Sequence, residues 1–188
     1  MKQLKRLVLF LLVITILGYV LSPLYKSNDN SEYRLESSVI IHAPIQTVFD
    51  YLGNSENAKD WSSFVDHISP LNSNVYKDGT TKSIRRCYRN TNELGMVWDE
   101  EVLSTKANEL RTLSIYNMNK FPMQTSDLQT DQIYESIDSN TTLLIFRLYK
   151  LIDFTSYSDL LKMKASGYII SPIFKQNLSN IKREVEKL

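Results

Sequence analysis

The sequence lacks the residues from which covalent cross-links and metal centres are built. Cys87 is the only cysteine among 188 residues, so no disulfide can form within the chain. CxxC and HExxH motifs and a clustered His/Asp/Cys set are absent, and His42 and His67 are isolated. We therefore expect neither a metal site nor a cofactor. A Ser-His-Asp arrangement and a nucleophile motif are also absent, so we assign no residue a catalytic role.

The chain has no large excess of charge of either sign. It carries 22 basic and 21 acidic residues, and four basic residues but no acidic ones fall within residues 1–26. The remainder is mildly acidic, which argues against nucleic acid as a partner because phosphate contacts need a basic face. The closely spaced cations Lys82, Arg85, Arg86 and Arg89 are interpreted as a solvated strand surface.

Only one hydrophobic run is long. Residues 7–25 contain no charged side chain, and as a helix they would extend about 28 Å, close to the thickness of a bilayer's hydrocarbon core. Basic residues cluster on its N-terminal side, which favours a cytoplasmic N-terminus and a domain outside the inner membrane, in the periplasm if the source has one. A cleaved signal peptide is the alternative, but no small-x-small cleavage site follows the run. We predict a single-pass anchor over residues 1–26.

A polar segment and a domain follow the anchor. Residues 27–33 are rich in Asn and Ser, which predicts a short tether before a domain over residues 34–188. Residues 33–42 alternate like a strand, and Pro44 then suits the first turn of a helix. An apolar stripe runs through that helix to Gly53, which we expect to end it in a left-handed conformation. Ser55 is expected to cap a second short helical turn before Trp61.

The pattern in the rest of the domain predicts several strands followed by a helix. Residues 62–151 contain six strand-like pieces with short turns between them, which indicates antiparallel neighbours. Ser171 and Pro172 predict the start of an amphipathic helix that runs to the end of the chain. Residues 157–170 are expected to form a separate helical piece that is interrupted near Gly167. The order predicts an α+β domain in which a curved antiparallel sheet of about six to seven strands wraps around a long C-terminal helix.

The start of this domain resembles a known superfamily. The stretch "VIIHAPIQTVFDYLGNSENAKDW" is similar to the opening of the START-like superfamily, also called SRPBCC, which includes polyketide cyclase/dehydrase-type proteins, coenzyme Q-binding proteins and the major pollen allergens. The resemblance extends over residues 36–188 and implies a helix-grip fold with an elongated cavity between the sheet and the last helix. The residues that carry it are Ile41, Ala43, Pro44, Val48, Phe49, Leu52 and Trp61.

Alternation along the strands predicts which side chains face that cavity. Trp98, Glu100 and Val102 share one face of a strand, so the two apolar residues are expected to draw the carboxylate of Glu100 inward. The alternative is that Glu100 sits at the rim or pairs with an arginine such as Arg85 or Arg111, because an unpaired buried carboxylate is costly.

Further cavity candidates come from later strands and the helix. Phe146 and Leu148 should face inward from one strand, and Phe174 and Leu178 from the helix. Tyr116 and Tyr134 are candidate hydroxyl groups, although a register shift of one residue would reverse the face of either one. Ordinary core packing is the alternative for all of these residues.

Three functional hypotheses follow. The first is a membrane-anchored domain that binds a lipid, an isoprenoid or another apolar or amphipathic small molecule in the implied cavity. The second is a cyclase- or dehydratase-type enzyme that uses Glu100 or a cavity tyrosine as acid or base. The third is a structural or interaction protein with a vestigial cavity. The volume and lining of the interior should discriminate between them.

Overall fold

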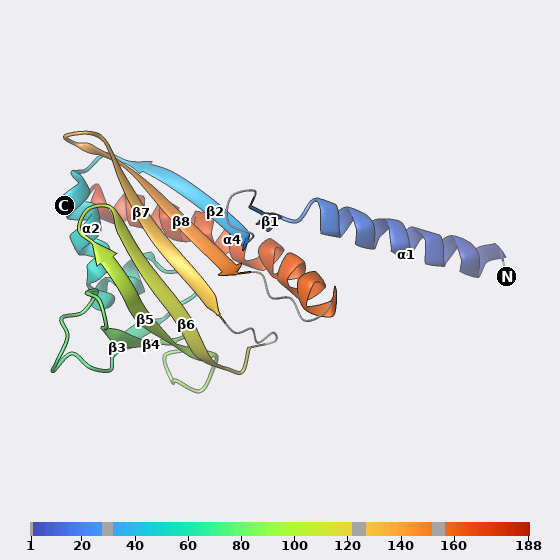
Figure 1. Ribbon diagram of the computed structural model, residues 1–188, viewed down its shortest axis with the longest axis horizontal. Coiled ribbons are helices and arrows are strands. Elements are labelled where there is room, and N and C mark those ends of the chain that lie inside the picture. The colour runs from blue at the N-terminus through green and yellow to red at the C-terminus, as the bar shows by residue number, and fades with distance from the viewer. Residues whose placement is uncertain (1, 28–31, 122–126, 152–156) are drawn as a thin grey trace.

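The computed structural model describes residues 2–27, 32–121, 127–151 and 157–188, and it consists of a long N-terminal helix followed by one α+β domain (Figure 1). In chain order the elements are α1 (Lys2–Val20), β1 (Tyr25–Lys26), β2 (Glu32–Ile41), α2 (Ile45–Gly53), the 3-10 turn η1 (Ser55–Asn57), α3 (Ala58–Trp61), β3 (His67–Pro70), β4 (Ile84–Tyr88), β5 (Val97–Lys106), β6 (Leu110–Asn119), β7 (Leu128–Asp138), β8 (Thr141–Leu151) and α4 (Tyr157–Val185).

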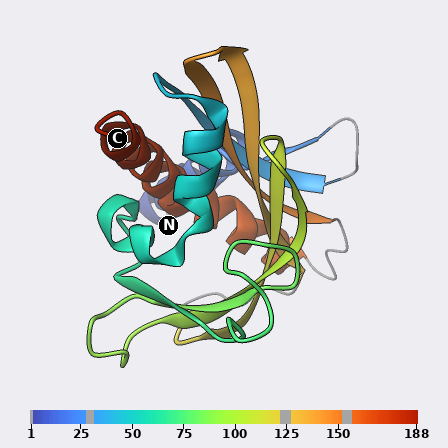
Figure 2. The same cartoon turned by 90° about the vertical axis from the view of Figure 1, so that its left-hand side faces the viewer.

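The strands form one antiparallel sheet that curves around α4. Its eight strands lie in the order β1-β2-β8-β7-β6-β5-β4-β3. Viewed along α4, the sheet bends around one side of the helix, while α2 and α3 cover one end (Figure 2). The predicted α+β class and helix-grip architecture are therefore confirmed. The sheet exceeds the predicted six to seven strands because β1, a pair of residues before β2, extends it by one strand.

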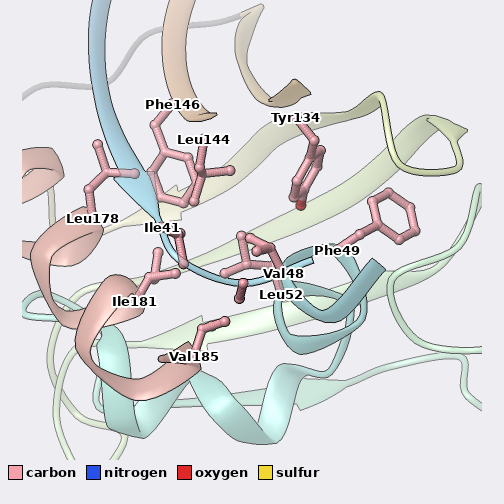
Figure 3. Packing of buried hydrophobic residues seen from close by; sticks show 11 residues of the cluster. Ile41, Val48, Phe49, Leu52, Tyr134, Leu144, Phe146, Leu178, Ile181 and Val185 are labelled. Carbon is pink, nitrogen blue, oxygen red and sulfur yellow. The ribbon is translucent and has the colours of Figure 1, made fainter. Parts of the chain in front are cut away.

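The break between β2 and α2 closes one end of the core. Val48, Phe49 and Leu52 of α2 are buried against the sheet and against the second half of α4 (Figure 3). Gly53 ends α2 as predicted, but the chain continues in extended conformation instead of a left-handed cap. The side chain of Asn54, and not that of Ser55, caps the following turn by accepting a hydrogen bond from a backbone N–H.

Helix α4 is continuous over 29 residues, which corrects the prediction of two helical pieces. Ser171 is buried inside it and Pro172 lies within it. Pro172 forgoes one backbone hydrogen bond, but the helix packs on the sheet on both sides of this point. Its first half buries Met163 with Leu35 and Leu148, and its second half joins the core shown in Figure 3. This burial holds both halves in one helix.

The segment after α1 is part of the domain. Leu24 is fully buried, and β1 pairs with β2 immediately after it. Gly167 permits this packing, because a Cβ atom there would lie 3.1 Å from the backbone nitrogen of Leu24. The predicted tether over 27–33 thus overlaps β2, which begins at Glu32, and residues 28–31 lie outside the described residues.

Candidate ligand cavity

A cavity of about 540 Å³ lies between the curved sheet and α4. Its walls come from α3 and the segment after it, from the inward faces of β3 to β8, and from α4 as far as Asn177. Apolar side chains make up most of the lining. Those from the strands are Ile68, Trp98, Leu113, Ile115, Met118, Leu128, Phe146 and Leu148, and those from α4 are Met163, Ile169, Ile170, Ile173 and Phe174.

Aromatic rings form two separate parts of the wall. The ring of Trp98 lies 5.7 Å from that of Phe64 and 5.4 Å from that of Phe121, measured between centroids. Phe146 packs edge-on against Trp61 and Phe174. These contacts fix broad apolar surfaces in the cavity and leave their ring faces and edges available to a ligand.

A buried ion pair interrupts this apolar wall. Nη2 of Arg85 lies 2.8 Å from Oε2 of Glu100, and Nε of Arg85 donates a second hydrogen bond to the same oxygen. The indole N–H of Trp98 donates to Oε1 of Glu100 at 3.0 Å. Burial opposes the charge on Arg85, but the attraction and hydrogen bond of Glu100, together with weaker interactions with Cys87 and Asp78, outweigh it and raise the pKa of Arg85. Arg85 is therefore a cavity residue and not part of the solvated strand surface that the sequence suggested.

Most of the remaining polar groups of the lining form hydrogen bonds with other groups of the protein. Oε1 of Gln132 accepts hydrogen bonds from Arg111 and from the hydroxyl of Tyr134. Oδ1 of Asn177 accepts from both the backbone N–H and the hydroxyl of Ser63. Burial raises the pKa of Tyr134 to about 12, so its hydroxyl stays protonated and can donate. These groups orient the walls at little cost in unsatisfied polar atoms.

Five of the nine predicted residues line the cavity: Trp98, Glu100, Phe146, Leu148 and Phe174. Glu100 adopts the paired arrangement that was the alternative, with Arg85 as its partner.

The structure places the other four predicted residues elsewhere. Val102 is fully buried beyond the cavity, and Leu178 packs in the core beneath α2. Tyr134 points inward, but Arg111 and Gln132 engage its hydroxyl in that core. Tyr116 pairs with Asp99 on the other face of the sheet.

Helix α4 supplies lining residues that the sequence reasoning missed. Because residues 157–170 were treated as a separate piece, their register relative to the later stripe was not considered. Met163, Ser166, Ile170, Ile173 and Asn177 all line the cavity and recur at spacings of 3, 4, 3 and 4. This helical spacing would have identified them if the helix had been expected to continue past Pro172.

Part of the cavity lining is exposed along the first half of α4. Two of its lining residues are largely exposed, with Ile169 at 59% and the side chain of Lys162 at 61%. Among the described residues, no group of three or more His, Cys, Asp or Glu side chains is placed to hold a metal ion. The arrangement is suited to binding, since the two strand-borne carboxylates of the lining, Glu100 and Asp131, already accept hydrogen bonds from the protein.

Known structures share this architecture. Norcoclaurine synthase from Thalictrum flavum, solved with dopamine and hydroxybenzaldehyde, is similar with a TM-score of 0.62, 8% identity and coverage of 84% of this chain and 88% of that one. The Zhui aromatase/cyclase from Streptomyces sp. R1128 is similar with a TM-score of 0.57, 12% identity and coverage of 83% and 94%. Ara h 8.0201 is similar with a TM-score of 0.58, 9% identity and coverage of 84% and 99%.

These similarities define the class of fold. At such low identities they show that this chain has a helix-grip fold. What the chain binds or catalyses has to be inferred from its own residues. No protein-family model matches the chain, and no curated protein matches it.

Proposed function

We propose that this protein is a membrane-anchored member of the START-like superfamily whose cavity binds an apolar or amphipathic small molecule, such as a lipid or an isoprenoid. The observation that carries the proposal is the cavity of about 540 Å³, which falls within the range of about 300–1,000 Å³ typical of small-molecule sites. A mostly apolar wall with few polar groups suits a ligand with a long apolar part. A vestigial cavity would be expected to be filled by side chains.

The ion pair of Arg85 and Glu100 supports binding over catalysis. Each oxygen of Glu100 already accepts a hydrogen bond from Arg85 or Trp98, and the two candidate tyrosines lie outside the lining. These contacts compete with the hydrogen bond to a substrate that a general acid or base must make. The pair instead offers a compact polar point at which a ligand hydroxyl or carbonyl can be oriented.

The proposed anchor is α1. Residues Gln3–Val20 form a helix long and apolar enough to cross a membrane, a property that signal sequences share. Cleavage just after this helix would remove the carbonyl of Gly18 that accepts a hydrogen bond from Tyr168, and cleavage beyond Leu24 would also remove that residue from its buried cluster with Leu35, Leu128 and Leu148. Since the domain uses this segment, we propose that α1 remains attached and that the domain lies outside the inner membrane. The intact mass of the protein extracted from membranes should therefore include residues 1–26.

Ligand binding is tested on the full-length chain extracted in mild detergent. Native mass spectrometry should show an added mass that organic extraction releases as an apolar compound. Ile115→Trp places a large ring in the cavity and should abolish the added mass. Ser114→Trp is the matched control, because its neighbouring position faces away from the cavity and ligand binding should persist. Equal loading of both variants, or no apolar ligand on the native chain, would contradict the proposal.

A further inference from the structure

The exposed apolar side chains of α4 are confined to its first half. Tyr157 is 88% exposed, Leu161 47%, Tyr168 45% and Ile169 59%. They occupy the solvent side of the helix, away from the buried residues Met163, Ser166 and Gly167. Beyond Pro172 the exposed side chains of α4 are polar, namely Lys175, Gln176, Ser179 and Arg183.

This apolar face, comprising Tyr157, Leu161, Tyr168 and Ile169, lies next to the end of α1. The hydroxyl of Tyr168 donates a 2.8 Å hydrogen bond to the carbonyl oxygen of Gly18. One turn away, the hydroxyl of Ser22 donates to the carbonyl oxygen of Lys164 at 2.6 Å. Figure 1 shows α1 leaving the domain at the end where α4 begins. A membrane crossed by α1 therefore comes close to this part of α4.

We propose that the apolar face of α4 lies on the surface of the bilayer that α1 spans, so that the cavity opens toward lipid and exchanges its ligand directly with the membrane. This inference rests on the proposed function in treating α1 as an attached anchor. Tyrosine rings favour the membrane interface, and the apolar side chains exposed at the end of α4 next to α1 can insert there. A bilayer is the partner because the exposed apolar surface of α1 leads directly to this face.

Ile169 links the membrane surface to the cavity. It is exposed on the apolar face and also belongs to the cavity lining, as does the neighbouring cation Lys162. A ligand leaving the bilayer at Ile169 would meet Ile170 and Ile173 within one helical turn, without crossing water. The cost of exposing its apolar part to water is thereby avoided.

The contact is measured with an environment-sensitive nitrobenzoxadiazole label on single introduced thiols. The full-length Leu161→Cys and Ser179→Cys variants are labelled and reconstituted in vesicles of phosphatidylcholine and phosphatidylglycerol. Cys87 is fully buried and should not react. The label at position 161 should emit at shorter wavelength and be quenched by lipids carrying a doxyl group, whereas the label at position 179 should not. Equal, water-like emission at both positions overturns the inference, as does a shielded label at 161 that the lipids do not quench, because protein would then cover it.

Ligand exchange provides an independent readout. Vesicles loaded with cis-parinaric acid should transfer this probe to the reconstituted protein several-fold more slowly in Leu161→Glu than in the native chain or Ser179→Glu. Affinity for the probe in detergent should be unchanged, because position 161 lies outside the cavity lining. Equal transfer rates overturn the inference. Quenching at position 161 without probe uptake by any variant contradicts the binding function alone, and uptake without quenching contradicts the membrane contact alone.

Discussion

Arg85 and Glu100 face each other on the paired strands β4 and β5 and form an ion pair within the cavity wall. Their side chains are only 5% and 15% exposed, so each charge depends on the other for compensation. Two opposite charges taken out of water gain little net stability as a pair, but removal of one leaves the other uncompensated. The pair therefore gives the cavity a fixed polar point without a net charge.

Removal of one partner should destabilise the fold more than removal of both. Arg85→Met should lower the free energy of unfolding by about 3–5 kcal/mol, because it leaves the buried carboxylate of Glu100 without an opposite charge. The double variant Arg85→Met with Glu100→Leu should recover most of this loss. Urea unfolding of the full-length chain in detergent measures both values. A double variant as unstable as the single one would show that the pair's charges are not the source of the loss.

The segment after α1 should contribute to the stability of the domain. Leu24 is fully buried among Leu35, Leu128, Leu148 and Met163. Leu24→Ala should therefore lower the free energy of unfolding by about 2–5 kcal/mol, as expected for a cavity left in a packed core. Leu21→Ala is the control, since Leu21 is 68% exposed and its loss should have little effect in detergent. Equal effects of the two substitutions would mean that residues 21–27 act only as a linker.

The fold was predictable where one local pattern governs one element. Pro44 and the stripe through Val48 and Leu52 predicted α2, and alternation in β5 placed Trp98 and Glu100 toward the cavity. These signals depend on neighbouring residues along the chain, so they can be read without knowledge of distant contacts.

The residues whose positions were wrongly predicted are positioned by contacts between distant segments of the chain. Gly167 suggested a helix break, but its missing side chain instead makes room for Leu24, more than a hundred residues earlier. Tyr134 faces inward as its alternation permits, yet Arg111 of the adjacent strand engages its hydroxyl in the core. Only the three-dimensional arrangement shows which part of an inward face borders the cavity.

Gly79 should be intolerant of a side chain. It adopts a positive φ of +73°, and a Cβ atom there would lie 2.3 Å from the carbonyl oxygen of Gly53. Its own carbonyl accepts a hydrogen bond from Nε of Arg111. Gly79→Ala should therefore destabilise the domain by at least about 1–2 kcal/mol, measured by urea unfolding. Gly18→Ala is the matched control, because nothing lies within 4 Å of the added atom, and a similar loss there would refute the steric explanation.

Two buried carboxylates should give opposite dependences of stability on pH. Hydrogen bonding from Arg86 lowers the pKa of Asp99 in the folded protein. Its stabilisation is therefore complete above the ordinary carboxyl pKa of about 3.9 and is lost as the pH falls through the lowered value. Asp99→Asn should make the free energy of unfolding fall less steeply on acidification below about pH 4.

Asp131 should behave in the opposite sense, because burial raises its pKa despite hydrogen bonds and the charge of Arg147. The folded state then binds the proton more tightly than the unfolded state. The favourable contribution is present below the ordinary pKa and is lost as the pH rises through the raised one. Asp131→Asn should therefore gain stability relative to the native chain as the pH rises from about 4 toward neutrality. Asp99→Asn should instead lose stability relative to the native chain as the pH rises toward about 4, and its deficit should be constant above that pH. Urea unfolding of Asp99→Asn below about pH 4 and of Asp131→Asn above it measures the two slopes relative to the native chain. Slopes of the same sign would contradict the assignment of opposite environments to these two carboxylates.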